Sequence, residues 1–241
     1  MIRLSVNVNK VATLRNARGG ALPSVRRAAE VAIAAGCHGI TVHPRPDERH
    51  IRRADVRELA GWLPVELNVE GYPDAAWIAL VEEVRPAQAT LVPDPPGVLT
   101  SNAGWEFARV DRSWLAATVV RLRATGARVS LFVDPRAEAV EGARDAGADR
   151  VELYTEHYAR EFVTPRRDAV LAEYRAAAAR AVDLGLGVNA GHDLDLANLP
   201  LLARTLPGLR EVSIGHALIS EALFRGLDAT VRAYVAALSD R

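Results

Sequence analysis

The sequence predicts an α/β protein: a (β/α)8 (TIM) barrel with extra helices, forming a single domain over residues 1–241. Short β-branched runs alternate with Ala-, Leu- and Arg-rich segments of helical period along the whole chain. Eight such units in 241 residues match the usual size of this barrel. Several helical segments also end at a small residue and a glycine, with a strand directly after, as in "AAGCHGITVHP" and "DAGADRVELYTE". Glycine suits the left-handed turn that stops a helix.

Eight segments have the near-continuous apolar or β-branched composition of parallel strands that are covered on both faces. They are residues 3–9, 39–44, 65–71, 89–93, 128–134, 150–156, 187–192 and 211–216. Helices are expected near 23–35, 53–62, 74–84, 111–124, 137–146, 168–184, 196–205 and 217–237.

Two connecting segments stand out. Residues 157–167 are expected to add a short helix after the sixth strand, and the Pro/Gly-rich loop 93–104 is expected to act as a lid over the active-site face. An open doubly wound sheet is the alternative architecture. The first βα turn lacks the G-x-G-x-x-G pattern, which weighs against a dinucleotide-binding version of that sheet.

The charge balance and the single cysteine exclude several classes of function. Thirty acidic residues balance thirty basic ones, so no global field attracts nucleic acid or an anionic membrane. Cys37 is alone, which excludes an internal disulfide and a cysteine-based metal cluster. The start "MIRLSVNVN" is typical of a strand, not of a signal peptide, and no apolar run reaches the length of a membrane helix. We therefore expect a soluble, cytoplasmic protein.

Polar and ionisable side chains gather where the predicted strands end or in the adjoining loops, and this end of a (β/α)8 barrel carries the active site. They are Asn7, Asn9, Lys10, His43, Arg45, Arg49, His50, Glu70, Thr100, Glu152, Glu156, Asn189, His192 and His216. Gly215 stands directly before His216 at the end of the eighth strand. His43, Glu70 and His192 stand on different strand ends, and imidazole and partly buried carboxyl groups titrate near neutral pH. We expect these three to be catalytic.

The other polar residues have more than one interpretation. Asn7, Asn9 and Asn189 fit either substrate binding or hydrogen bonding to the backbone at the barrel mouth. Glu152 and Glu156 are expected to form a solvated or packing pair. No H-x-H or H-E-x-x-H spacing is present, so acid–base chemistry is favoured over a metal site.

Two groups of residues on this rim are suited to bind anions. "NARGG" offers Arg18, and "NAGH" and "GH" place backbone amides near helix starts after the seventh and eighth strands, where barrels often bind phosphate. Arg45, Arg49 and His50 form a second basic cluster after the second strand. Two anion sites on one rim predict either a bisphosphate or two phosphorylated substrates.

Several stretches together resemble one enzyme family in order and spacing. They are "VNVNKVATLRNARGG", "GITVHPRPDERHI", "LNVEG", "VSLFVD", "GLGVNAGHDL" and "SIGHALI". The resemblance is to the pyridoxine 5′-phosphate synthases of vitamin B6 biosynthesis. It implies a (β/α)8 barrel with extra helices, assembled as an octamer, that needs no metal or organic cofactor. The implied reaction condenses 3-amino-2-oxopropyl phosphate with 1-deoxy-D-xylulose 5-phosphate to pyridoxine 5′-phosphate, phosphate and water.

The resemblance also implies roles for individual residues. His43 is implied as a base, Glu70 as a second acid–base group and His192 as a proton donor. The positions implied to hold the aminoketone phosphate are Asn7, Arg18, Gly215 and His216. Those implied to hold deoxyxylulose phosphate are Asn9, Lys10, Arg45, His50 and Thr100, with Asp193 also lining the site.

The sequence departs from the family pattern at two places. Asn9 and Lys10 replace the usual Asp–His pair of "N-x-D-H", and Asp193 replaces the glycine that usually follows "NAGH". Lys10 is the only lysine in the chain. The alternative hypothesis is therefore a Schiff-base lyase or aldolase acting on a phosphosugar with Lys10 as nucleophile.

Overall fold

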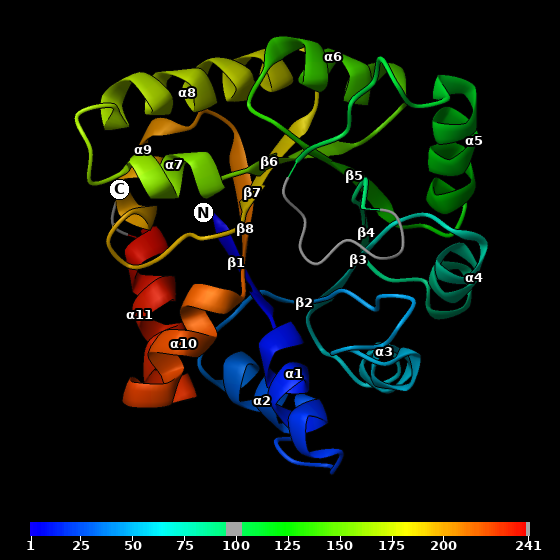
Figure 1. Cartoon of the computed structure of the whole chain (residues 1–241), viewed down its shortest axis with the longest axis vertical. Helices are drawn as coiled ribbons and strands as arrows, with labels where there is room; N and C mark the ends of the chain where they lie inside the picture. The colour runs from blue at the N-terminus through cyan, green and yellow to red at the C-terminus, as the bar shows by residue number, and fades with distance from the viewer. Residues whose placement is uncertain (95–102, 240–241) are drawn as a thin grey trace.

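Eight parallel strands close into a barrel in chain order in the computed structural model, which describes residues 1–94 and 103–239 (Figure 1). The strands are β1 (Arg3–Asn7), β2 (Gly39–Val42), β3 (Glu66–Gly71), β4 (Gln88–Leu91), β5 (Arg128–Val133), β6 (Arg150–Tyr154), β7 (Gly187–Gly191) and β8 (Leu209–Ile214). Each predicted strand is present, so the predicted (β/α)8 fold is confirmed.

Helices surround the strands (Figure 1). They are α1 (Asn9–Arg18), α2 (Val25–Ala34), α3 (Arg53–Ala60), α4 (Ala75–Val84), α5 (Arg112–Arg123), α6 (Ala137–Asp145), α7 (Glu156–Glu161), α8 (Arg167–Asp183), α9 (Leu199–Thr205), α10 (His216–Arg225) and α11 (Leu227–Ser239). The single helix predicted over 217–237 is wrong, because Gly226 adopts a φ of 86° and separates α10 from α11. Within the described residues, no helix is long and apolar enough to cross a membrane.

Helix α1 corrects the prediction for the first βα connection, where a strand over 3–9 and a loop were expected. β1 stops at Asn7, and Asn9 already belongs to the helix. The helix lacks a side-chain N-cap, and one of its buried residues is Arg15, which forms an ion pair with Asp55 at 2.6 Å. An arginine on the buried face hides the apolar period that normally identifies a helix.

The interior of the barrel is polar. The Ser5 and Thr41 hydroxyls lie 2.6 Å apart, and the Thr90 hydroxyl donates to Asn68 at 2.9 Å. Closer to the strand starts, the Gln88 amide donates to Glu211 at 3.1 Å. These bonds cross between strands and satisfy polar groups that would be costly to bury alone.

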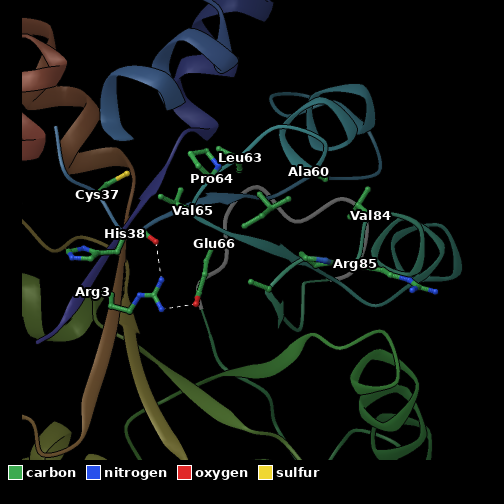
Figure 2. A pocket seen from close by; sticks show the side chains of 13 residues that line it. Arg3, Cys37, His38, Ala60, Leu63, Pro64, Val65, Glu66, Val84 and Arg85 are labelled. Carbon is green, nitrogen blue, oxygen red and sulfur yellow. Dashed lines mark hydrogen bonds and ion pairs between the residues drawn. The ribbon is translucent and has the colours of Figure 1, made fainter. Parts of the chain in front are cut away.

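A pocket of about 560 Å³ lies at the N-terminal ends of the strands, opposite the predicted active site (Figure 2). Arg3 is one of the residues that line the pocket, and its guanidinium donates to Glu66 at 2.6 Å and to the His38 carbonyl at 3.0 Å. Arg128 also pairs with Glu66. Because this face of a (β/α)8 barrel contributes to stability and not to catalysis, we assign the pocket no catalytic role.

Candidate active site

Glu70 lies near the C-terminal end of β3, with 5% of its surface exposed. Its Oε1 accepts from the Ser213 hydroxyl at 3.3 Å, and its Oε2 accepts from the Asn7 amide at 3.4 Å. The Trp77 indole donates to its backbone carbonyl at 3.0 Å. Residues of β1 and β8 thus hold the carboxyl group from two sides.

Burial and neighbouring acids set the protonation of Glu70. Burial raises its pKa to about 8, the Ser213 hydrogen bond opposes this rise, and the charge of Glu211 adds to it. Burial, followed by the charges of Glu70 and Glu211, also raises the pKa of Glu152 well above its ordinary value. A carboxyl group that titrates near neutral pH can both accept and donate a proton.

The expected Glu152–Glu156 pair is wrong. Glu152 is buried inside the barrel, whereas Glu156 begins α7 and pairs with Arg160 at 2.7 Å. The residues are four apart, but the chain leaves the strand at Tyr154, between them.

His43 follows β2 and is buried. Burial lowers its pKa well below the ordinary value, and the charges of His50 and Arg45 lower it further. The two imidazole rings lie 6.1 Å apart between centroids. Burial, then Arg45 and Lys10, lowers the pKa of His50 to about 4. Both rings are therefore neutral at pH 7, as a proton-accepting histidine must be.

His192 follows β7 in the left-handed region, with a φ of 78°. Its ring packs against Phe132 and Tyr154, at centroid distances of 5.0 and 5.3 Å. The Thr155 hydroxyl donates to the carbonyls of Gly191, at 2.6 Å, and of His192. These contacts fix the imidazole although its backbone conformation is one that few residues other than glycine adopt.

Two carboxylates affect the pKa of His192. Burial lowers its pKa, while the charges of Asp193 and Asp94 raise it. Asp193 has a φ of 57°, which aspartate tolerates better than most residues. The aspartate that replaces the family's glycine thus fits the turn and adds a negative charge beside the imidazole.

The charges of the basic cluster after β2 act on His43. Arg45 is buried and pairs with Asp94 at 3.8 Å. Lys10 is exposed in the first turn of α1, and its charge acts on His50. Lys10 and Asn9 are therefore on a helix, not at the end of a strand as predicted. Thr100 and most of the predicted lid lie outside the described residues.

The other predicted anion site, with Arg18, Gly215 and His216, is only partly brought together. Gly215 precedes α10 and lies against Asn7, since a Cβ on the glycine would come within 3.1 Å of the Asn7 side chain. His216 opens α10 and is exposed. Arg18 ends α1, also exposed, and among the described residues no hydrogen bond or ion pair joins it to the others.

Sequence reasoning did not identify Ser213, Asp94 or Thr155 as site residues. A single hydroxyl or carboxyl group next to a strand carries no recognisable spacing. Closure of the barrel through β8–β1–β2–β3 is what places Ser213 at Glu70. Among residues 1–94 and 103–239, no three His, Cys, Asp or Glu side chains are arranged to share a metal ion.

Gly71, next to Glu70, is required by close packing. A Cβ there would lie 2.1 Å from the Trp77 indole nitrogen, which anchors the Glu70 carbonyl. We expect Gly71→Ala to lower the free energy of unfolding by about 1–3 kcal/mol in urea titrations and to reduce turnover. Gly20→Ala is the control, because no atom lies within 4 Å of a Cβ there. Equal stability of the two variants would contradict this packing.

Comparison with known proteins identifies the family of the chain. Residues 4–240 match the family described as "Pyridoxal phosphate biosynthesis protein PdxJ". A "Pyridoxine 5'-phosphate synthase" from Porphyromonas gingivalis is 55% identical over 234 residues, covering 97% of this chain and 98% of its own length. One from Xanthomonas oryzae pv. oryzae is 53% identical over 244 residues, covering 97% and 95%.

Solved structures support the barrel fold alone. A thiamine phosphate pyrophosphorylase from Pyrococcus furiosus superimposes with a TM-score of 0.63 at 13% identity, covering 99% of this chain and 96% of its own. An N-(5'-phosphoribosyl)anthranilate isomerase from the same organism gives 0.62 at 12% identity, with both chains fully covered. The nearly full-length family match and the relatives above half identity go further than fold: the chain belongs to the pyridoxal phosphate biosynthesis PdxJ family.

Proposed function

We infer that the protein is a pyridoxine 5′-phosphate synthase, which condenses 3-amino-2-oxopropyl phosphate with 1-deoxy-D-xylulose 5-phosphate. The observation that carries this conclusion is full-length identity of 55% with a protein of that name. The site is consistent with it, because His43, Glu70 and His192 are acid–base groups at the C-terminal end of one barrel.

The chemistry of the condensation suits these groups. An amine adds to a ketone, water and phosphate leave, and the ring closes, so each step moves a proton. In the proposed roles, neutral His43 accepts protons, Glu70 accepts and returns them, and His192 donates to a leaving oxygen. The depressed pKa of His43 favours its role as a base, and the raised pKa of Glu70 favours its acid–base role. Burial lowers the pKa of His192 as well, so its role as donor rests on the charges of Asp193 and Asp94, which oppose that effect.

The function is tested by incubating the purified protein with both substrates and quantifying products by chromatography. We expect pyridoxine 5′-phosphate and one equivalent of inorganic phosphate, and neither when one substrate is omitted. Phosphate release from one substrate alone would indicate a phosphatase or lyase and overturn the proposal.

The two basic regions should serve different substrates. Arg45→Ala is expected to raise KM for deoxyxylulose phosphate about 10- to 100-fold, because a charge-assisted hydrogen bond to phosphate is lost. Arg18→Ala should instead raise KM for the aminoketone phosphate. Steady-state kinetics with each substrate varied in turn measures both effects. If Arg45→Ala raises only the KM for the aminoketone, the assignment of the two sites is reversed.

Asp193 should set the pH range of the proton donor. Asp193→Asn removes a negative charge that raises the pKa of His192, so that pKa falls further. A donor works only while it is protonated, so the alkaline limb of kcat should move to lower pH. Asparagine also tolerates the left-handed backbone. An unchanged limb in the pH–rate profile would mean that His192 is not the donor.

The exposure of Lys10 weighs against the Schiff-base hypothesis. Such lysines are activated by desolvation or by neighbouring cations, and Lys10 is exposed on α1. Borohydride reduction in the presence of deoxyxylulose phosphate should therefore leave no adduct on Lys10. The cytoplasmic location and the octamer that the family resemblance implies stay predictions.

A further inference from the structure

A chain of hydrogen bonds joins His43 to Glu70 through Asn9 and Asn7. Asn9 has no role in the proton transfers described above. We propose that Asn9 is a positioning residue, which fixes the backbone of His43 with its side-chain oxygen and orients Glu70 through Asn7. The proposal rests on the proposed function and adds a residue to its machinery.

The Asn9 side chain reaches the neighbouring strand. Its Oδ1 accepts from the backbone N–H of His43 at 2.9 Å. β1 pairs with β2 and β2 with β3, so the ends of these three strands are adjacent. His43 lies just beyond the last paired residue of β2, Val42, where the strand ladder no longer holds the backbone. The bond from Asn9 replaces the next ladder contact and sets the direction of the imidazole.

The backbone of Asn9 acts on a second group. Its N–H donates to Asn7 Oδ1 at 3.0 Å. This leaves the Asn7 NH2 group to face Glu70 Oε2, at 3.4 Å. The opposite amide orientation would turn an oxygen toward the carboxylate and an NH2 toward an N–H, losing both bonds. The backbone N–H of residue 9, which any residue except proline supplies, therefore determines which end of the Asn7 amide meets Glu70.

The two oxygens of the Glu70 carboxyl group have different hydrogen-bond partners. Asn7 can only donate to Oε2, whereas the Ser213 hydroxyl at Oε1 can donate or accept. Asn7 thus favours the ionised carboxylate, and a proton on Glu70 has its acceptor on the Ser213 side. Loss of the Asn7 contact should make the carboxyl group harder to ionise.

This position differs from the role that the family resemblance implies for Asn9, which is contact with deoxyxylulose phosphate. The contact that the structure shows for the Asn9 side chain is the bond from the His43 backbone N–H to Oδ1. Aspartate, the residue of the family pattern at this position, also has a side-chain oxygen there. Either residue can therefore accept from the backbone N–H of His43. The hydrogen bond, not the charge, is the shared feature.

The test compares three variants of the full chain by steady-state kinetics. Asn9→Leu keeps the side-chain shape but has no acceptor, and should lower kcat about 10- to 100-fold because a small misplacement of a catalytic group is costly. KM for each substrate should change less than about threefold. Asn9→Asp keeps the acceptor and should retain kcat within about threefold. Leu14→Gln, at an exposed position of the same helix, separates a general disturbance of α1 from the loss of the bond.

A pH profile provides a readout that a purely structural role would not move. As a base Glu70 must be ionised, so its ionisation should set the acidic limb of the kcat profile, and Asn7→Leu should shift that limb to higher pH because the ionised carboxylate loses a donor. If Asn9→Leu does not fold, Asn9→Ala, which also lacks the acceptor for His43 and is well tolerated in a helix, decides the case by the same comparison of kcat with Asn9→Asp.

Three outcomes would overturn the proposal: a rise in KM for deoxyxylulose phosphate with normal kcat in Asn9→Leu, equal loss of kcat in Asn9→Asp and Asn9→Leu, or an unmoved limb in Asn7→Leu. A wild-type protein without turnover would contradict the proposed function instead.

Discussion

Replacing Glu70 by glutamine is expected to lower kcat about 10²- to 10⁴-fold, the usual contribution of a positioned acid–base group. Glutamine keeps the volume and can still accept from Asn7 through its oxygen and donate to Ser213 through its nitrogen. The substrates should bind with little change in KM, so the loss is one of chemistry. Steady-state kinetics under saturation with both substrates measures it. A loss below about tenfold would remove Glu70 from the catalytic groups.

Relative to the wild type, the same variant should become more stable as pH rises, because only the wild type loses stability. The pKa of Glu70 is raised from its ordinary value of 4.5 to about 8 by burial, so the folded state binds this proton more tightly than the unfolded chain. The associated stability is complete below pH 4.5 and is lost as pH rises through about 8. Glutamine cannot ionise, so urea titrations should show the variant increasingly more stable than wild type between about pH 5 and pH 9. A constant difference over this range would place the ionisation elsewhere.

Replacing His192 by asparagine is expected to lower kcat by a similar factor, about 10²- to 10⁴-fold. Asparagine is the suitable replacement because it tolerates a φ of 78°, whereas alanine would add backbone strain to the loss of the imidazole. The ring also packs against Phe132 and Tyr154, so a modest loss of stability should accompany the loss of turnover.

Two controls separate the chemistry of His192 from its packing. Tyr154→Phe keeps the ring contact and should retain most activity, because burial raises the pKa of the Tyr154 phenol to about 12 and so disfavours its ionisation at neutral pH. The alkaline limb of the pH–rate profile should disappear in His192→Asn, since the donor has been removed. Persistence of that limb would assign the donor to another group, even if kcat falls.

The strands were predictable because each is a short apolar run followed by a turn, and a buried parallel strand needs little else. Helix α1 was not, because Arg15 is buried through its ion pair with Asp55, and that pairing is visible only in three dimensions. The division of the last helix at Gly226 was also missed. One glycine within a helical pattern is tolerated often enough that composition does not predict a break.

The candidate site was predictable where chemistry depends on residue type at a strand end, as for His43, Glu70 and His192. It was not predictable where a role depends on which strands are neighbours. Ser213 reaches Glu70 because the barrel closes between β8 and β1, and Asn9 reaches His43 because the helix begins directly after β1. Glu152 and Glu156 are expected to form a pair because two glutamates four residues apart suggest a shared face. Only Glu152 lies on the strand, however, and Glu156 begins the next helix.

In the proposed function, acid–base groups at the barrel mouth condense two phosphorylated substrates without a covalent lysine intermediate. The decisive experiment follows the formation of pyridoxine 5′-phosphate from both substrates by the wild type, Lys10→Arg and Glu70→Gln in parallel. We expect product from the wild type and from Lys10→Arg, and a rate lower by about 10²-fold or more from Glu70→Gln. No product from the wild type above the level of Glu70→Gln, or abolished turnover in Lys10→Arg, would refute acid–base catalysis by these groups.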